Sequence, residues 1–119
     1  MNHDLELAST LKSCLELAGT TIRPDVAEQG DNPPYVIFAE VALPEGTYVL
    51  GGESSLVPSR YQIDVYAKTR FEANALAQSV TSKLEDAFGA IILSRQSLFE
   101  PDTRLRRVLL DLYIWFPNS

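Results

Sequence analysis

Residues 61–89 read YQIDVYAKTRFEANALAQSVTSKLEDAFG, a strand pattern that leads directly into a helix pattern. Apolar and polar residues alternate over 61–67, as they do in a strand that buries one face. Thr69 and Glu72 then form a capping box and Gly89 supplies a C-terminal stop, which predicts a helix of about nineteen residues. The apolar stripe expected to face the sheet consists of Ala73, Leu76, Ala77, Val80, Leu84, Ala87 and Phe88.

Further strands are predicted on both sides of this unit. Residues 35–41 are dense in aromatic and β-branched side chains. Residues 91–99 and 105–116 predict a hairpin around a turn at 100–103. One face of the last strand is apolar, and the other is mixed. The mixed face carries Arg107, Leu109, Asp111, Tyr113 and Trp115. A mixed face is typical of a sheet side that is partly covered by a neighbouring chain or loop.

The N-terminal part predicts a helix and a connector. Residues 4–18 are amphipathic and precede Gly19, with Cys14 at the edge of the apolar stripe, where we expect a buried structural thiol rather than a nucleophile. The stripe comprises Leu5, Ala8, Leu11, Leu15 and Ala18. Residues 20–34 are rich in proline and glycine and predict a connector. The order therefore predicts an α+β fold, with two helices packed on one face of a mainly antiparallel sheet of about four to five strands.

Composition limits the chemistry. A chain of 119 residues with 45% hydrophobic residues predicts a single domain over 1–119. The one cysteine excludes an internal disulfide, and the one histidine excludes metal sites that need two imidazoles or several thiolates. We therefore expect no metal and no cofactor. No apolar run is long enough for a membrane span and the first residues are acidic, so we expect synthesis in the cytoplasm and no membrane partner.

The charge disfavours nucleic acid as a partner. The formal net charge is −6, with nine acidic residues against two basic ones in residues 1–59. The later half has eight basic residues against seven acidic ones, an asymmetry that favours head-to-tail contacts if the halves form different faces. Strand alternation puts Arg104 and Arg106 on one face and Arg107 on the other. We therefore expect no direct sequence-specific binding of nucleic acid. Four aromatic residues are expected to serve packing rather than base stacking: Phe38, Tyr66, Tyr113 and Trp115.

A glycine-containing segment lies between the predicted strands at 35–41 and 61–67. Residues 44–58 include Gly51 and Gly52 around a short apolar insert. They lack the Gly-Lys-Ser/Thr ending of a phosphate-binding loop, and no helix follows directly. We therefore predict a flexible hairpin tip or mobile arm at 44–58 rather than a nucleotide site.

Paired carboxylates are the one acid–base device that this composition offers. Asp64 and Asp111 lie on strands that are candidates for neighbours. Arginines at 60, 95 and 107 are candidates to pair with either carboxylate across adjacent strands, and we favour this structural role. No Ser-His-Asp set is expected, because His3 lies in a terminus predicted to fray.

The chain also resembles a known family. The resemblance runs through residues 34–38, a glycine-containing loop to 56, the strand at 60–67, the helix that begins near 70–73, and the final strand at 110–115. In this order and length the chain is similar to the tail-completion proteins of long-tailed bacteriophages and prophages. The most specific part is the strand Gln62-Ile63-Asp64-Val65-Tyr66 that leads into the alanine-rich helix.

The resemblance implies a structural protein of the virion tail and not an enzyme. It implies a ring, commonly six-fold, that ends growth of the tail tube and joins the tail to the head. The implied partners are further copies of the chain, the tail tube protein and a head-completion or connector protein. The 44–58 arm is then expected to become ordered on the next subunit or the tube. The expected contact residues are Tyr48, Val49, Leu50, Arg107, Tyr113 and Trp115.

Two other classes of function fit the sequence. A host-encoded module that binds one protein through the mixed face of the last strand has the same features without the phage context. A small enzyme that uses Asp64 and Asp111 requires a pocket and a carboxylate with a perturbed pKa.

Overall fold

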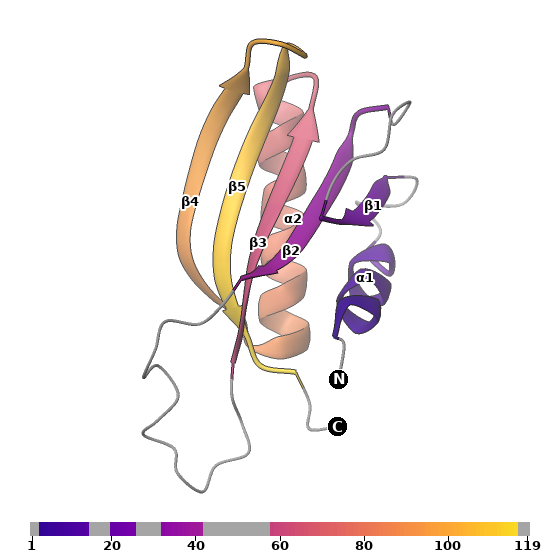
Figure 1. Cartoon of the computed structure of the whole chain (residues 1–119), viewed down its shortest axis with the longest axis vertical. Coiled ribbons are helices and arrows are strands. Elements are labelled where there is room, and N and C mark those ends of the chain that lie inside the picture. The colour runs from indigo at the N-terminus through magenta and orange to yellow at the C-terminus, as the bar shows by residue number, and fades with distance from the viewer. Residues whose placement is uncertain (1–2, 15–19, 26–31, 42–57, 117–119) are drawn as a thin grey trace, which may run out of the picture.

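A computed structural model describes residues 3–14, 20–25, 32–41 and 58–116. It contains α1 (Asp4–Lys12), β1 (Thr21–Pro24), β2 (Tyr35–Val41), β3 (Ser59–Ala67), α2 (Arg70–Phe88), β4 (Ile91–Glu100) and β5 (Leu105–Ile114). The strands form one sheet in the order β1-β2-β3-β5-β4 (Figure 1). Only the β1–β2 pair is parallel. The predicted α+β fold with a mainly antiparallel sheet is confirmed.

Helix α2 begins and ends where its capping residues predict. The Thr69 hydroxyl accepts a hydrogen bond from the Glu72 backbone N–H at 3.1 Å. Gly89 closes the helix in the left-handed conformation, with φ of 64°, which costs glycine nothing because it has no Cβ. The buried positions of the helix follow the predicted stripe from Ala73 to Leu84 and include Thr81, which was not predicted. Near the helix end Phe88 is only partly buried and Ala87 is exposed.

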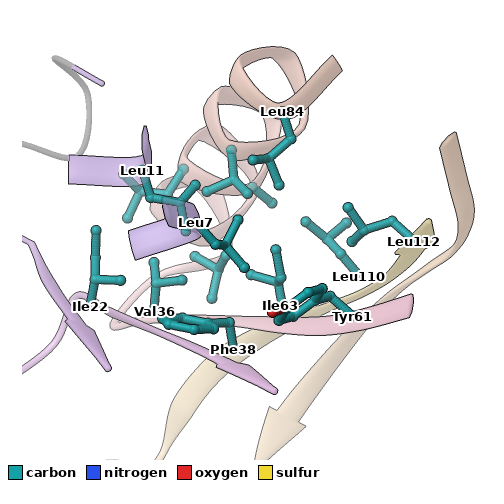
Figure 2. Close-up of a cluster of buried hydrophobic side chains, with 14 of the residues drawn as sticks. Leu7, Leu11, Ile22, Val36, Phe38, Tyr61, Ile63, Leu84, Leu110 and Leu112 are labelled. Carbon is teal, nitrogen blue, oxygen red and sulfur yellow. The ribbon is translucent and has the colours of Figure 1, made fainter. Parts of the chain in front are cut away.

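Both helices pack on the same face of the sheet and share its core. Figure 2 shows Leu7 and Leu11 of α1 and Leu84 of α2 directed at the apolar side chains of β2, β3 and β5. The largest completely buried side chain is that of Tyr61, whose hydroxyl donates a hydrogen bond to Asp4 Oδ1 at 2.8 Å. Burial, together with this hydrogen bond, raises the pKa of Tyr61 well above its usual range.

Helix α1 is shorter than predicted and buries a different stripe. It ends at Lys12, because the Ser13 hydroxyl and the Cys14 N–H bond to the carbonyls of the last helical turn. Leu7 and Leu11 are completely buried, whereas Leu5 is 80% exposed, so the predicted stripe was wrong at Leu5. The buried thiol predicted at Cys14 is confirmed. Residues 15–19 lie outside the described residues.

The predicted connector contains a strand that the sequence analysis missed. Residues Thr21–Pro24 form β1, which pairs in parallel with β2 in the register Thr21↔Tyr35. Ile22 is buried in the core. Pro24 ends the strand at the sheet edge, where its missing N–H costs no ladder bond.

Three further predictions concern His3, the arm at 44–58 and membrane-spanning segments. His3 is not frayed, because its ring stacks on Phe116 with centroids 4.3 Å apart. Residues 42–57, which hold most of the predicted arm, lie outside the described residues. In the part of the chain that the structure describes, no helix is long and apolar enough to cross a membrane.

Candidate functional site

The sheet has an open face, defined here as the side away from α1 and α2. No described helix covers it (Figure 1). On β5 this face presents the mixed side chains that the alternation predicted. Each of them is partly exposed: Arg107, Leu109, Asp111, Tyr113 and Trp115. The residues that alternate with them are buried against the helices: Val108, Leu110, Leu112, Ile114 and Phe116. The two predicted faces of the last strand are therefore confirmed.

A bidentate ion pair joins β3 to β5 on the open face. Arg60 Nε lies 3.0 Å from Asp111 Oδ1, and Arg60 Nη2 lies 2.6 Å from Asp111 Oδ2. The Asp111 side chain is only 14% exposed, so the pair is partly shielded from water. The hydrogen bond to Asp111 raises the pKa of Arg60. This geometry fixes both side chains, because a guanidinium and a carboxylate fit in one plane.

A second arginine holds two carboxylates farther along the same strands. Arg107 Nε donates to Asp64 Oδ1 at 2.8 Å, and Arg107 Nη1 donates to Glu100 Oε1 at 3.2 Å. The hydrogen bond to Asp64 raises the pKa of Arg107, although burial opposes it. The Tyr66 ring lies 5.8 Å from the guanidinium carbon, and burial raises the pKa of Tyr66. Arg107 therefore ties β3, β5 and the end of β4 together.

These contacts give Asp64 and Asp111 structural roles. Each carboxylate is bound by a different arginine, as the cross-strand hypothesis predicted. Arg95, the third candidate partner, is instead directed at α2, with its Nη1 3.4 Å from Gln78 Oε1. Among the residues described here, no cluster of three or more metal-binding side chains occurs. The arrangement suits a rigid surface rather than an acid–base pair.

Aromatic side chains lie at both ends of the open face. Tyr113 and Trp115 meet edge to face with centroids 6.1 Å apart. Tyr35 and Tyr66 stack at the other end, with centroids 4.9 Å apart. Phe38, the remaining aromatic residue considered above, is 1% exposed and belongs to the core. Partly exposed aromatic rings beside fixed ion pairs are typical of a protein-binding surface.

Strand β4 is a second surface feature, which the sequence analysis missed. It forms the edge of the sheet, and no described strand pairs with its outer side. It exposes large apolar side chains along its length: Ile91, Leu93, Leu98 and Phe99. The sequence feature that could have indicated an exposed edge strand is the lack of apolar–polar alternation in 91–99, since a half-buried strand shows a period of two.

Of the six predicted contact residues, three can be placed. Arg107, Tyr113 and Trp115 lie on or beside the open face, where Arg107 is already engaged in two ion pairs. Tyr48, Val49 and Leu50 lie outside the described residues. Arg106 lies 4.6 Å above the Phe99 ring, on the opposite side of β5 from Arg107, as alternation predicted. Arg104 was wrongly placed on the strand, because it lies in the turn before β5 with φ of 61°.

Comparisons with known proteins agree with this geometry. Residues 6–116 match the family described as tail completion protein gp17. Among solved structures, a chain from the virion of a native gene transfer agent particle superposes with a TM-score of 0.69. The two chains are 17% identical, and the match covers 92% of this chain and 90% of that one, which shows a shared fold. A search of curated proteins found no match.

Proposed function

The chain belongs to the tail completion protein gp17 family, and from this membership we propose that copies of it form a ring at the head-proximal end of a phage tail tube. Membership itself implies a structural role in a phage tail rather than catalysis. The ring, in our proposal, ends tube growth and presents the surface to which the filled head docks. The family match over 6–116 is the single observation that carries this function.

The two surface features of the sheet support a ring. A ring that closes head to tail needs two different patches on each subunit, because one copy's first patch contacts its neighbour's second. The open face and the β4 edge are two such patches, and they carry different chemistry. The open face is ionic and aromatic, whereas β4 exposes aliphatic side chains and Phe99.

We assign the contacts as follows. Arg107, Tyr113 and Trp115 contact a neighbouring copy or the tail tube protein. The arm at 44–58 contacts the same partners through Tyr48, Val49 and Leu50. A six-fold ring is the expected assembly. A head-completion or connector protein is the expected partner on the side of the ring that faces away from the tail tube. The cytoplasm of the bacterial host is the expected site of synthesis, and the head–tail junction the final location.

Deletion of the gene from its resident prophage tests the function. After induction, negative-stain electron microscopy of the lysate is expected to show full heads apart from tails that are unjoined or abnormally long. A complemented strain should yield joined virions. Normal joined virions from the deletion strain, or the absence of a phage locus around the gene, would contradict the proposal and favour a host-encoded protein-binding module.

The arm has its own test. Deletion of residues 47–52 is expected to leave the fold intact, since it removes none of the core residues that the structure describes, but to abolish assembly. Circular dichroism checks the fold, and complementation of the deletion prophage checks assembly. Unimpaired complementation would refute the role of the arm.

A further inference from the structure

A basic hollow lies between the first turns of α2 and the end of β4. Its volume is about 140 Å³, and no acidic residue lines it. Arg70 and Arg106 line the hollow, and neither has an ion-pair partner among the described residues. Phe99, which also lines it, is 46% exposed, and Phe71, next to Arg70 in the chain, is 85% exposed. Arginines beside exposed aromatic rings are typical of the residues that dominate protein interfaces.

An acidic trough of about 490 Å³ lies on the open face. Its charged lining consists of four carboxylates and one guanidinium: Asp25, Asp64, Glu100, Asp102 and Arg107. Asp64 and Glu100 are both paired with Arg107. Asp25 and Asp102 are exposed, and neither has an ion-pair partner in the part of the chain that the structure describes. The stacked rings of Tyr35 and Tyr66 also line the trough.

The hollow and the trough lie at the same end of the sheet, on opposite faces. Arg106, in the hollow, pairs with Ala67, and the next residue, Arg107, pairs with Tyr66 of the trough. Figure 1 shows the start of α2 and the β4–β5 turn at this end. Copies that stack face to back through these two patches touch at one end only, so successive copies are tilted. A tilted stack of identical contacts curves and can close into a ring.

We propose that the basic hollow of one copy docks on the acidic trough of the next copy, where Arg70 and Arg106 face Asp25 and Asp102. This inference rests on the proposed ring and identifies a contact between its subunits. A second copy is the occupant because both complementary patches belong to this one chain. Docking pairs guanidinium groups with carboxylates that have no ion-pair partner within the described residues, and it covers the exposed Phe99 ring.

Cross-linking between two single-cysteine chains tests the contact. One chain carries Ser97→Cys in the hollow and the other carries Thr103→Cys in the trough, each with Cys14→Ala. The purified chains are mixed at millimolar concentration and treated with a short bismaleimide, and mass spectrometry measures the covalent dimers. We expect a mixed dimer. A chain with Ser82→Cys, exposed on α2, replaces the Ser97→Cys chain as the control and is expected to give background yield.

Charge reversal distinguishes this contact from chance collision. Arg70→Asp in the Ser97→Cys chain should lower the yield of mixed dimer about tenfold, because it brings like charges together. Asp102→Arg in the Thr103→Cys chain should do the same, and the two reversals combined should restore the yield. Both positions are exposed, so both variants should keep their fold, which circular dichroism checks. Lys12→Asp, exposed at the end of α1, changes the net charge equally and should leave the yield unchanged.

Four outcomes would overturn the proposal. They are equal yields with Ser97→Cys and Ser82→Cys, no response to Arg70→Asp, no restoration by the combined reversals, and dimers of one chain alone at the mixed-dimer yield. The last result indicates a two-fold contact between like patches. Failure here leaves the tail role intact, because the morphology of virions from the deletion prophage tests that role. Normal virions from that strain would remove the tail role, whereas the contact is measured on purified chains.

Discussion

The two faces of the central strands differ in chemistry: one forms the folding core, and the other is the surface to which we assign assembly. On β3, Tyr61, Ile63 and Val65 are completely buried against the helices. Their immediate neighbours, Gln62, Asp64 and Tyr66, are partly exposed on the open face. The covered face is almost wholly apolar, whereas the open face is fastened by ion pairs. Because alternate residues serve the two faces, a single substitution can disturb one without disturbing the other.

The largest expected effect comes from adjacent leucines on β5. Leu110 is completely buried and Leu109 is half-buried on the open face. Leu110→Ala leaves a cavity in the core and should lower the free energy of unfolding by about 3 kcal/mol. Leu109→Ala should lower it by less than about 1 kcal/mol. Urea unfolding measures both. Equal losses at the two positions would contradict the division between the faces.

A smaller effect is expected at the ion pair that joins β3 and β5. A double-mutant cycle with Arg60→Met and Asp111→Asn should give a coupling free energy of about 1 kcal/mol, because the pair is bidentate and partly shielded. Urea unfolding of the four chains supplies the values. Asp102→Asn, in the exposed β4–β5 turn, serves as the control, with no coupling to Arg60 expected. A coupling near zero for Asp111 would show that the open face is not held by this pair.

Alkaline pH separates the two faces through their tyrosines. In the unfolded chain Tyr61 loses its proton near pH 10, but burial in the fold raises its pKa far above that value. Its contribution to stability is therefore complete below pH 10 and declines as the pH rises further. Between pH 9 and pH 10.5 the wild-type chain should lose about 0.8 kcal/mol more than Tyr61→Phe does.

Tyr66→Phe is the matched control for this titration. Tyr66 lies on the open face and its pKa is also raised, but less strongly than that of Tyr61. Its removal should therefore flatten the pH dependence less. If the stability of the wild-type and Tyr61→Phe chains depends on pH in the same way, the buried Tyr61 is not the cause of the loss of stability at alkaline pH.

The sequence predicts the elements whose signals are local. The alternation in 61–67, the hydroxyl of Thr69 and the glycine at 89 each act within a few residues, and the structure confirms all three. The predicted stripe of α1 was wrong at Leu5, because Leu5 lies three residues before Ala8 whereas Leu7 lies four residues before Leu11, so both leucines have an apolar neighbour at helical spacing. Only the position of the sheet decides which of them is buried.

The formation of strand β1 and the exposure of the apolar side chains of β4 depend on contacts between residues that are distant in the sequence. Residues 21–24 become a strand only because β2 offers an edge, while proline and glycine nearby indicate a connector. The exposure of β4 follows from its place at the end of the order β1-β2-β3-β5-β4, and strand order is not encoded locally.

The ion pairs were predictable in kind but not in partner. Sequence alone placed Asp64 and Asp111 on strands and offered three arginines. The observed register, Gln62 opposite Asp111 and Tyr66 opposite Arg107, selects Arg60 for one carboxylate and Arg107 for the other. The mixed composition of the β5 open face, which needed no register, was predicted in full.

The separation of assembly from folding is tested most directly by Trp115→Arg in the prophage. Trp115 is partly exposed beside Tyr113 and is not part of the core, so the change should cost only about 1 kcal/mol of stability, as measured by urea unfolding. The deletion prophage complemented with this chain is then imaged by negative-stain electron microscopy beside one complemented with Leu5→Arg, an exposed position on α1. We predict separate heads and tails with Trp115→Arg and joined virions with Leu5→Arg. Joined virions in equal proportion from both strains would contradict the account.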